Sequence, residues 1–178
     1  MRGVKEGASE ALGERRVRLT DGREGVLRAI RPDDRAAFLA FHAGLSEESR
    51  YFRYFSARRK LPETEIRHFS EVDQHTHAGV VVLVEGQLVG HALYDRLADP
   101  KEAEVALEVA DAFQGHGVGT AMLAELARVA TRAGVRRFVA HVLPTNQRML
   151  QVFRDLGFAE HARFEDGVIR VRIDLPGS

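Results

Sequence analysis

The sequence predicts a single α/β domain built around one mixed sheet. A chain of 178 residues can bury one hydrophobic core but is short for two ordinary domains. Segments in which apolar residues alternate, as in strands, are interleaved with segments of helical periodicity. The connections between them are short, and no internal repeat is visible. Together these observations favour helices packed on a mixed α/β sheet.

Composition limits the function. The 26 basic and 26 acidic residues balance, so no overall field attracts nucleic acid or an anionic membrane. The chain has no cysteine, which rules out disulfides and thiolate chemistry and suits a reducing compartment. The N-terminus lacks an apolar signal segment, and the longest apolar run, Ala78 to Val84, is too short to span a membrane. We therefore expect a cytoplasmic protein with no nucleic-acid or membrane partner.

Turn and capping residues predict the N-terminal elements. Residues 1–15 mix glycine and charge without periodicity and are expected to be a flexible tail. The Asp21–Gly22 turn joins two short strands. Arg31–Asp34 begins a helix, because proline fits the first turn and the aspartates oppose the helix dipole. Ser46 begins a second helix, and residues 62–71 form a third.

Two motifs in this half of the chain allow alternative interpretations. The run from Arg50 to Phe55 interleaves arginines with aromatics, as nucleic-acid stacking surfaces do, but the balanced charge favours an amphipathic helix with its aromatics inward. His75 and His77 would share one face of a strand and form half of a metal site. No clear third or fourth ligand is visible in the sequence, so we expect no metal.

The central strands differ in their predicted burial. Val80 to Val84 is apolar on both faces, which predicts cover on both sides of the sheet. In the next strand, Gly90 indicates a bulge or a close backbone approach. In the strand at residues 102–109, apolar residues alternate with glutamates, so that Glu104 and Glu108 share a face about 13 Å apart. By itself this pattern is typical of a half-exposed strand with surface glutamates.

The most informative stretch runs from Asp111 to Thr120 and reads Asp-Ala-Phe-Gln-Gly-His-Gly-Val-Gly-Thr. Glycines at positions 115, 117 and 119 let backbone N–H groups turn toward a ligand. The helix that follows adds the partial positive charge of its N-terminus, so an anion fits here. A dinucleotide fingerprint would need glycine in place of Thr120, and a P-loop would need a lysine, so neither motif fits. On spacing alone, a glycine-rich connection that binds nothing is the more common case.

The C-terminal third continues the alternation of helix and strand. The helix after the glycine loop has one apolar stripe, with Glu125 on its opposite side, and ends at Gly134. Residues 136–143 form a strand, and Pro144 begins a further helix. A hairpin between Phe158 and Ile173 completes the domain.

The spacing Gln114-x-x-Gly117-x-Gly119 resembles the acetyl-CoA pyrophosphate loop of the GNAT superfamily of N-acetyltransferases. The likeness extends beyond this loop. Residues 103–111 resemble the fourth strand of the family, and residues 146–158 resemble its asparagine-containing helix with a Gly-Phe exit.

Upstream segments indicate a particular branch of the family. Residues 27–34, 45–55 and 72–73 are similar to the acetyltransferase domain of bacterial Pat-type protein-lysine acetyltransferases. The resemblance implies one GNAT domain over residues 16–178. It also implies a mostly antiparallel, twisted sheet flanked by helices and splayed between the fourth and fifth strands.

The same resemblance implies acetyl-CoA as the acetyl donor, bound between the two splayed strands. Its pantetheine would pair with the backbone of Leu107, Glu108 and Val109, and Asn146 would orient it near the thioester. Its pyrophosphate would meet the glycine loop, which comprises Gln114, Gly115, His116, Gly117, Val118, Gly119 and Thr120. His116 stands where the family often has arginine or lysine, which would make one phosphate-facing charge depend on pH.

Acetyl transfer to an amine needs a base, because a lysine ammonium has an unperturbed pKa of about 10.4. Glu104 matches the strand-four glutamate of the family and is the expected general base, acting directly or through water. His141, on the following strand, is the second candidate. Many members use a tyrosine as the acid for the departing thiolate. Phe153 occupies that position here, so a water, or no dedicated acid, would serve.

The sequence leaves the acceptor open. The Pat-type resemblance favours a lysine on a protein, while a small amine such as an antibiotic or polyamine is an alternative acceptor. A non-catalytic acyl-CoA-binding regulator is a further alternative. Nothing in the sequence decides the oligomeric state, so a homodimer is allowed.

Overall fold

The computed structural model describes residues 13–56, 58–157 and 161–176. Its strands are β1 (Arg15–Arg18), β2 (Glu24–Ala29), β3 (His77–Val84), β4 (Gln87–Arg96), β5 (Glu102–Val109), β6 (Arg137–Val142), β7 (Ala162–Glu165) and β8 (Val168–Asp174). Its helices are α1 (Arg35–Gly44), α2 (Glu47–Tyr54), α3 (Glu63–Ser70), α4 (Val118–Arg132) and α5 (Gln147–Asp155). Short 3-10 turns lie at Pro32–Asp34 and Asp111–Phe113.

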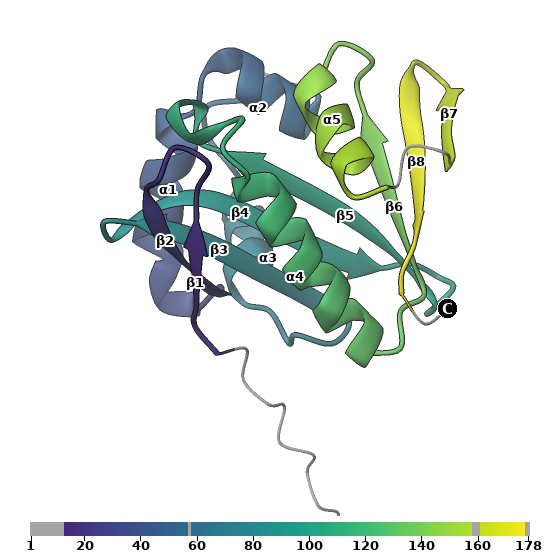
Figure 1. Ribbon diagram of the computed structural model, residues 1–178, viewed down its shortest axis with the longest axis horizontal. Coiled ribbons are helices and arrows are strands. Elements are labelled where there is room, and N and C mark those ends of the chain that lie inside the picture. Colours follow the sequence, from purple (N-terminus) through teal and green to yellow (C-terminus); the bar gives the residue numbers. More distant parts are fainter. Residues whose placement is uncertain (1–12, 57, 158–160, 177–178) are drawn as a thin grey trace, which may run out of the picture.

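The strands form one sheet in the order β1-β2-β3-β4-β5-β6-β8-β7. Every neighbouring pair is antiparallel except β5 and β6, which are parallel. Helix α4 crosses one face of the sheet, and α1 and α3 cover the other (Figure 1). This arrangement confirms the predicted mixed, mostly antiparallel sheet flanked by helices.

Strand β3 is buried on both faces, as its unbroken apolar run predicts. Val80 and Val82 belong to the core cluster that contains Met122 of α4. Val81 faces the opposite side and belongs to a second cluster with Phe38 of α1. The sheet therefore separates two hydrophobic layers, one under α4 and one under the N-terminal helices.

Gly90 in β4 is required by a close approach to α4. A Cβ atom at this position would lie 2.8 Å from a methyl carbon of Val118 and 2.9 Å from the terminal methyl of Met122. The pairing of β3 with β4 also shifts register next to this residue, between Val82 and Leu83. Both features predicted for Gly90, a bulge and a close backbone contact, are confirmed.

Glu125 does not lie on a solvated face of α4 as expected. Its side chain is buried and accepts hydrogen bonds from Arg15 at 2.9 Å and from Arg128 at 2.5 Å. The reason is that β1 lies beside this part of α4 (Figure 1), so the helix has cover on a side that periodicity assigned to solvent.

Some expectations fall partly beyond the described residues. Residues 1–12 of the expected tail lie outside them, and Arg15 already belongs to β1, where it pairs with Leu27. Phe158 at the start of the expected hairpin also lies outside them. In the part of the chain that the structure describes, no helix combines the length and the apolar character needed to cross a bilayer.

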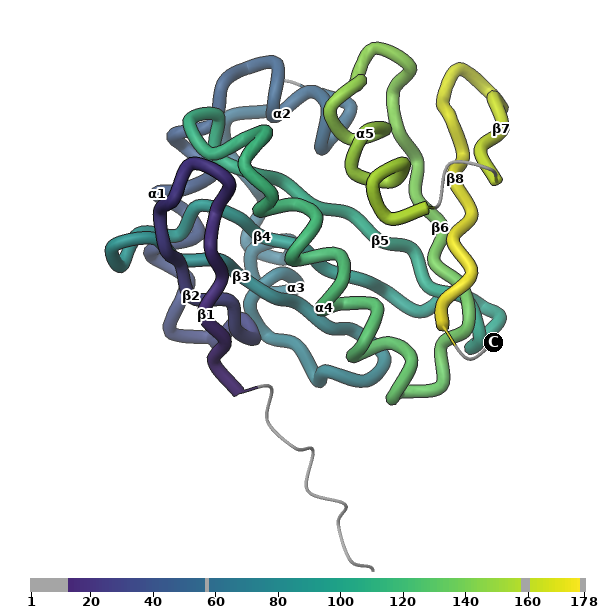
Figure 2. The backbone as a smooth tube through the Cα atoms, viewed as in Figure 1, coloured from purple at the N-terminus to yellow at the C-terminus, as the bar shows by residue number. Residues whose placement is uncertain are grey.

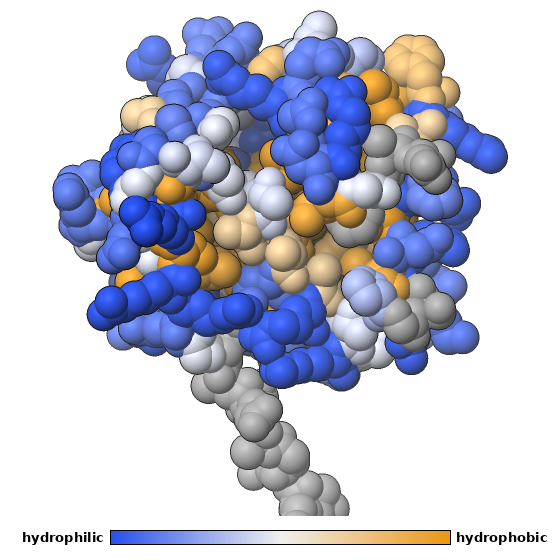
Figure 3. All heavy atoms as spheres, viewed as in Figure 1, coloured by the Kyte–Doolittle hydropathy of each residue, from blue (hydrophilic) through white to orange (hydrophobic). Residues whose placement is uncertain are grey.

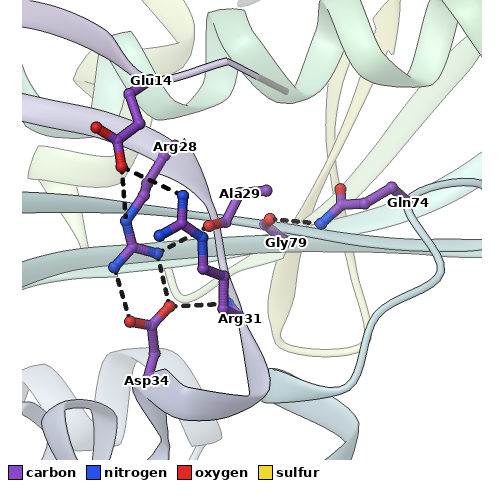
Figure 4. Close-up of polar contacts among 7 residues, drawn as sticks. All are labelled: Glu14, Arg28, Ala29, Arg31, Asp34, Gln74 and Gly79. Atoms are coloured by element: carbon purple, nitrogen blue, oxygen red, sulfur yellow. Dashed lines mark hydrogen bonds and ion pairs between the residues drawn. The ribbon is translucent and has the colours of Figure 1, made fainter. Parts of the chain in front are cut away.

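A buried ion pair connects the first hairpin to the helical layer. Arg28 of β2 donates two hydrogen bonds of 2.7 Å to the two carboxylate oxygens of Asp34 (Figure 4). The backbone N–H of Arg31 donates to the same carboxylate at 2.8 Å. The side chains of Arg28 and Asp34 are only 9% and 10% exposed. Arg28 also lies 3.9 Å from the carboxylate of Glu14, whereas removal of Arg28 would leave the buried Asp34 carboxylate without its charged partner.

Arg28→Ala is expected to lower the free energy of unfolding by about 3–5 kcal/mol, because it leaves the Asp34 carboxylate buried without its partner. Arg31→Ala is the matched control. The Arg31 side chain pairs with the exposed carboxylate of Glu14 at 3.2 Å, and such exposed pairs contribute at most about 1 kcal/mol. Urea denaturation measures both values, and equal losses in the two variants would contradict the assignment.

The same pair predicts a pH dependence. Burial alone would raise the pKa of Asp34, but the hydrogen bonds from Arg28 and the Arg31 backbone hold that pKa below its ordinary value. A lowered folded-state pKa contributes stability above the ordinary aspartate pKa of about 3.9, and this contribution is lost as the pH falls through the folded-state pKa. As the pH falls from about 3.9 through the folded-state pKa of Asp34, Arg28→Ala should therefore lose less of its free energy of unfolding than the wild type does.

Candidate active site

Strands β5 and β6 pair only over their first residues. The parallel register covers three pairs, Glu102 with Arg137, Ala103 with Phe138 and Glu104 with Val139. Beyond these pairs β5 continues to Val109 and β6 to Val142, and the two strands separate (Figure 2). The facing edge of β5 beyond Glu104 is therefore left without a partner strand. The splay was predicted between the fourth and fifth strands of the family, which are β5 and β6 in this chain. The divergence confirms that part of the expected fold.

A cavity of about 670 Å³ lies beside the end of β5. That volume is within the usual range of small-molecule sites. Its wall also includes residues of the glycine loop, the first turn of α4, α5 and α2. In the space-filling view, apolar residues gather in the middle of the same face, within a hydrophilic rim (Figure 3). The predicted binding residues in the wall are Leu107, Glu108, Val109, Gln114, Gly115, Gly117, Gly119, Thr120 and Asn146.

The three glycines of the loop serve two purposes. Gly115 and Gly117 have φ angles of 77° and 89°, which side-chain-bearing residues rarely adopt. Gly119 lies within α4, where a Cβ atom would be 3.3 Å from the Leu107 side chain. Helix α4 begins directly after Gly117, and the first N–H groups of a helix have no intrahelical partner. The loop therefore presents backbone donors and a positive helix end to the cavity.

Hydrogen bonds attach this loop to α2. The carboxylate of Asp111 accepts from the Ser46 N–H at 2.9 Å, the Ser46 hydroxyl at 2.6 Å and the Ser49 hydroxyl at 2.8 Å. The side-chain amide of Gln114 donates to the Val109 carbonyl at 2.9 Å and to the Ser49 hydroxyl at 3.0 Å. The end of β5, the loop and the start of α2 thus form one connected unit.

Two predicted loop residues, His116 and Val118, do not line the cavity. Val118 is buried in the core. The His116 ring faces the β1–β2 turn, with Nδ1 at 3.4 Å from the Thr20 hydroxyl and 3.7 Å from the Asp21 carboxylate. The side chains of these residues therefore lie away from the wall, although their backbone remains in the loop.

The helix α5 provides a cation that the sequence did not indicate. Arg148 lies in the cavity wall, and its guanidinium donates to the Gln114 side-chain oxygen. No motif links this arginine to the glycine loop, because the two are distant in sequence and meet only where α5 packs beside the loop. Asn146 caps the same helix, and its side-chain oxygen accepts from the Met149 N–H at 3.1 Å.

Phe153 belongs to the core and not to the cavity. It is buried in the cluster beneath α4 and does not line the wall. The residue that the resemblance places at the tyrosine position is thus a packing residue with no proton to donate.

Glu104 and His141 lie together where the two strands begin to diverge. Glu104 forms the last pair with Val139, and His141 follows two residues later in β6. The His141 Nδ1 atom lies 3.0 Å from Glu104 Oε1, and the two side chains are 38% and 50% exposed. Neither residue is in the wall of the cavity. They form a solvent-accessible pair at the point where β5 and β6 begin to diverge.

Glu108 lies on the same strand but is buried, unlike the surface glutamate that alternation suggests. The Tyr54 hydroxyl donates to its two oxygens at 3.1 and 3.2 Å, and His91 Nδ1 lies at 3.4 Å. Burial alone would raise the pKa of Glu108, but His91, Arg53 and Tyr54 hold that pKa below its ordinary value. The residue is covered because α2 packs over this end of β5, which strand periodicity cannot show.

Gly117→Val should weaken CoA binding at least tenfold, because the new side chain strains the loop and turns its N–H groups away from the phosphates. Gly134→Val is the matched control. Gly134 follows the other end of α4, has nearly the same φ of 87°, and has open space around it. Calorimetric titration with CoA and thermal unfolding test both variants. Both variants should be destabilised to a similar extent, but only Gly117→Val should lose CoA affinity. Equal CoA affinities in the two variants would contradict the role of the loop.

Comparison with known proteins agrees with this geometry. A sequence model described as the acetyltransferase (GNAT) family matches residues 41–158. The acetyltransferase Pat of Mycolicibacterium smegmatis is 33% identical over 164 residues, which are 90% of this chain and 48% of that protein. The chain thus spans about half the length of this relative.

Solved structures give the same result. The crystal structure of the GNAT domain of S. lividans PAT superposes with a TM-score of 0.85 at 37% identity, covering 91% of this chain and 97% of that one. YncA of Salmonella typhimurium, solved with its cofactor acetyl-CoA, shares the fold with a TM-score of 0.69 at 20% identity, covering 86% and 95%. From the family match, the fold and the splayed site together, the chain belongs to the GNAT family of N-acetyltransferases.

Proposed function

We propose that this chain transfers an acetyl group from acetyl-CoA to a lysine side chain of a protein, with Glu104 as the general base. The observation that carries the proposal is the cavity at the unpaired end of β5, bounded by a glycine loop with two positive-φ glycines at the start of α4. A thioester donor with a pyrophosphate fits both parts of this site. Membership of the GNAT family supports the same donor.

Two backbone features account for donor binding. The edge of β5 from Leu107 to Val109 has no partner strand. The Val109 carbonyl already accepts from the Gln114 side chain, and the remaining free backbone groups of this edge can pair with the peptide-like pantetheine arm. The N–H groups at the start of α4, together with the side chain of Arg148, favour the pyrophosphate at the other end of the cavity. A backbone N–H near Val109 would polarise the thioester carbonyl and stabilise the oxyanion formed on attack.

Proton transfer favours Glu104 over Glu108. Glu104 is half exposed, so it can meet an amine that arrives from solvent and can release the proton afterwards. His141 contacts it at 3.0 Å and orients its carboxylate. Glu108 already accepts from Tyr54 and has a lowered pKa, which makes it a weaker base. With Phe153 in the core, water protonates the departing thiolate.

The surface beside the cavity supports a protein acceptor. Phe52 and Arg53 of α2 line the cavity, while Tyr51 of the same helix and Phe55 directly after it are exposed. Aromatic and arginine side chains are common where proteins bind one another. The similarity to Pat proteins supports the same choice, although the chain spans about half of the M. smegmatis relative.

Glu104→Gln should lower kcat by roughly 10² to 10⁴-fold, because the amide keeps the shape of the carboxylate but cannot accept the proton. CoA affinity should be unchanged. Glu85→Gln, an exposed glutamate in the β3–β4 turn, is the control and should retain full turnover. Thiol release from acetyl-CoA measures the rate. If Glu108→Gln or His141→Ala loses turnover while Glu104→Gln keeps it, the base is assigned to the wrong residue.

The acceptor is tested by incubating the enzyme and acetyl-CoA with a cell extract and mapping acetylated lysines by mass spectrometry. We expect a limited set of lysines that are acetylated by the wild type above the level found with Glu104→Gln. Specificity constants for peptides containing these lysines should exceed those for polyamines and aminoglycosides. Efficient turnover of a small amine, without enzyme-dependent protein acetylation, would replace the proposed acceptor and leave the acetyltransferase assignment intact.

A further inference from the structure

Three potential metal ligands meet on the sheet face opposite α4. They are His68 of α3, His77 of β3 and Asp95 of β4, and one ligand atom from each lies within 4.8 Å of the others. Among the described residues this is the only such group of three or more. We propose that this cluster binds a divalent transition-metal ion, with Zn²⁺ as the best-matched ion.

The distances and donor types fit such an ion. His68 Nε2 lies 2.9 Å from Asp95 Oδ1, and His77 Nε2 lies 3.7 Å from the same oxygen. In a tetrahedral zinc site with bonds of 2.0–2.2 Å, neighbouring ligand atoms lie about 3.4 Å apart. Two imidazole nitrogens and one carboxylate are a common set of zinc ligands. The side chains of His68 and Asp95 are 46% and 37% exposed, so water can reach a fourth position.

His77 is held in place before any ion binds. The Asp73 carboxylate accepts from the backbone N–H groups of His75, Thr76 and His77 at 2.8, 2.8 and 3.0 Å, which fixes the start of β3. The Nε2 atom of His77 is buried and has no hydrogen-bond partner within the described residues. A metal bond would satisfy this nitrogen, whereas a hydrogen bond between His68 and Asp95 alone leaves it unpaired.

Only a small rearrangement is needed. The rings of His68 and His77 are stacked, with centroids 3.9 Å apart and an angle of 10° between their planes. The Nε2 atoms of both rings lie near the same Asp95 oxygen, at 2.9 and 3.7 Å, while the ring planes are nearly parallel. Because His68 is half exposed, its ring can turn to direct its lone pair at an ion shared with His77 and Asp95.

The cluster is separate from the acetyl-CoA site. None of the three residues lines the cavity, and only Asp95 is a neighbour of the site, paired with Glu104 across β4 and β5. The sequence suggested His75 with His77 as the half-site. The structure replaces His75, which is exposed and outside the cluster, with ligands from α3 and β4. Metal binding can therefore be tested without reference to acetyl transfer.

The test uses the full chain, without a polyhistidine tag and treated with chelator. Calorimetric titration with Zn²⁺ should give one ion per chain, and Co²⁺ should give the visible absorption of a tetrahedral site. His77→Ala, His68→Ala and Asp95→Asn should each lower affinity at least about tenfold, since even second-sphere changes cost 10- to 100-fold. His75→Ala is the matched control and should bind like the wild type. The chain contains no cysteine, so thiolates cannot account for binding.

Circular dichroism confirms that each variant is folded. Because His68 is exposed, its variant keeps the test valid if a change at the partly buried His77 disturbs the fold. Absence of saturable binding at one ion per chain would overturn the proposal. Equal affinities for the wild type, His68→Ala and Asp95→Asn would also overturn it, because the ion would then sit elsewhere.

Discussion

The separation of β5 from β6 is the constraint on which the rest of the site depends. The two parallel strands share only three residue pairs, after which their hydrogen-bonding edges diverge. Unpaired backbone groups inside a protein are costly unless a ligand or water satisfies them. The divergence therefore creates both the space for a ligand and the donors and acceptors that hold it. Helices α4 and α5 then bound the opening, and together with the glycine loop they form much of the cavity wall.

Helix α2 connects the two sides of this opening. Ser46 and Ser49 at its start donate hydrogen bonds to Asp111, and Ser49 also accepts one from Gln114 of the glycine loop. Phe52 and Arg53 near its end line the cavity on the side where the acceptor is proposed to bind. One short helix thus contacts both the glycine loop and the part of the cavity wall where the acceptor is proposed to bind.

Two glutamates on one strand illustrate how environment separates chemical roles. Glu104 and Glu108 lie on the same face of β5, four residues apart. Glu104 stands at the divergence of the strands, exposed and beside His141. Glu108 lies under α2, buried and engaged by Tyr54 and His91. The first is open to solvent, whereas the second is part of the cavity wall and already accepts hydrogen bonds from the protein.

The order of most elements, the double burial of β3, the special role of Gly90 and the glycine loop could be predicted from the sequence. These features depend on local periodicity, capping and backbone geometry, which neighbouring residues specify. The packed fold was needed to show that Glu125 and Glu108 are buried, that Arg148 contacts the loop, that His116 turns away, and that His77 meets His68 and Asp95. Each of these outcomes depends on which distant element packs beside a residue, and periodicity along one segment contains no information about that neighbour.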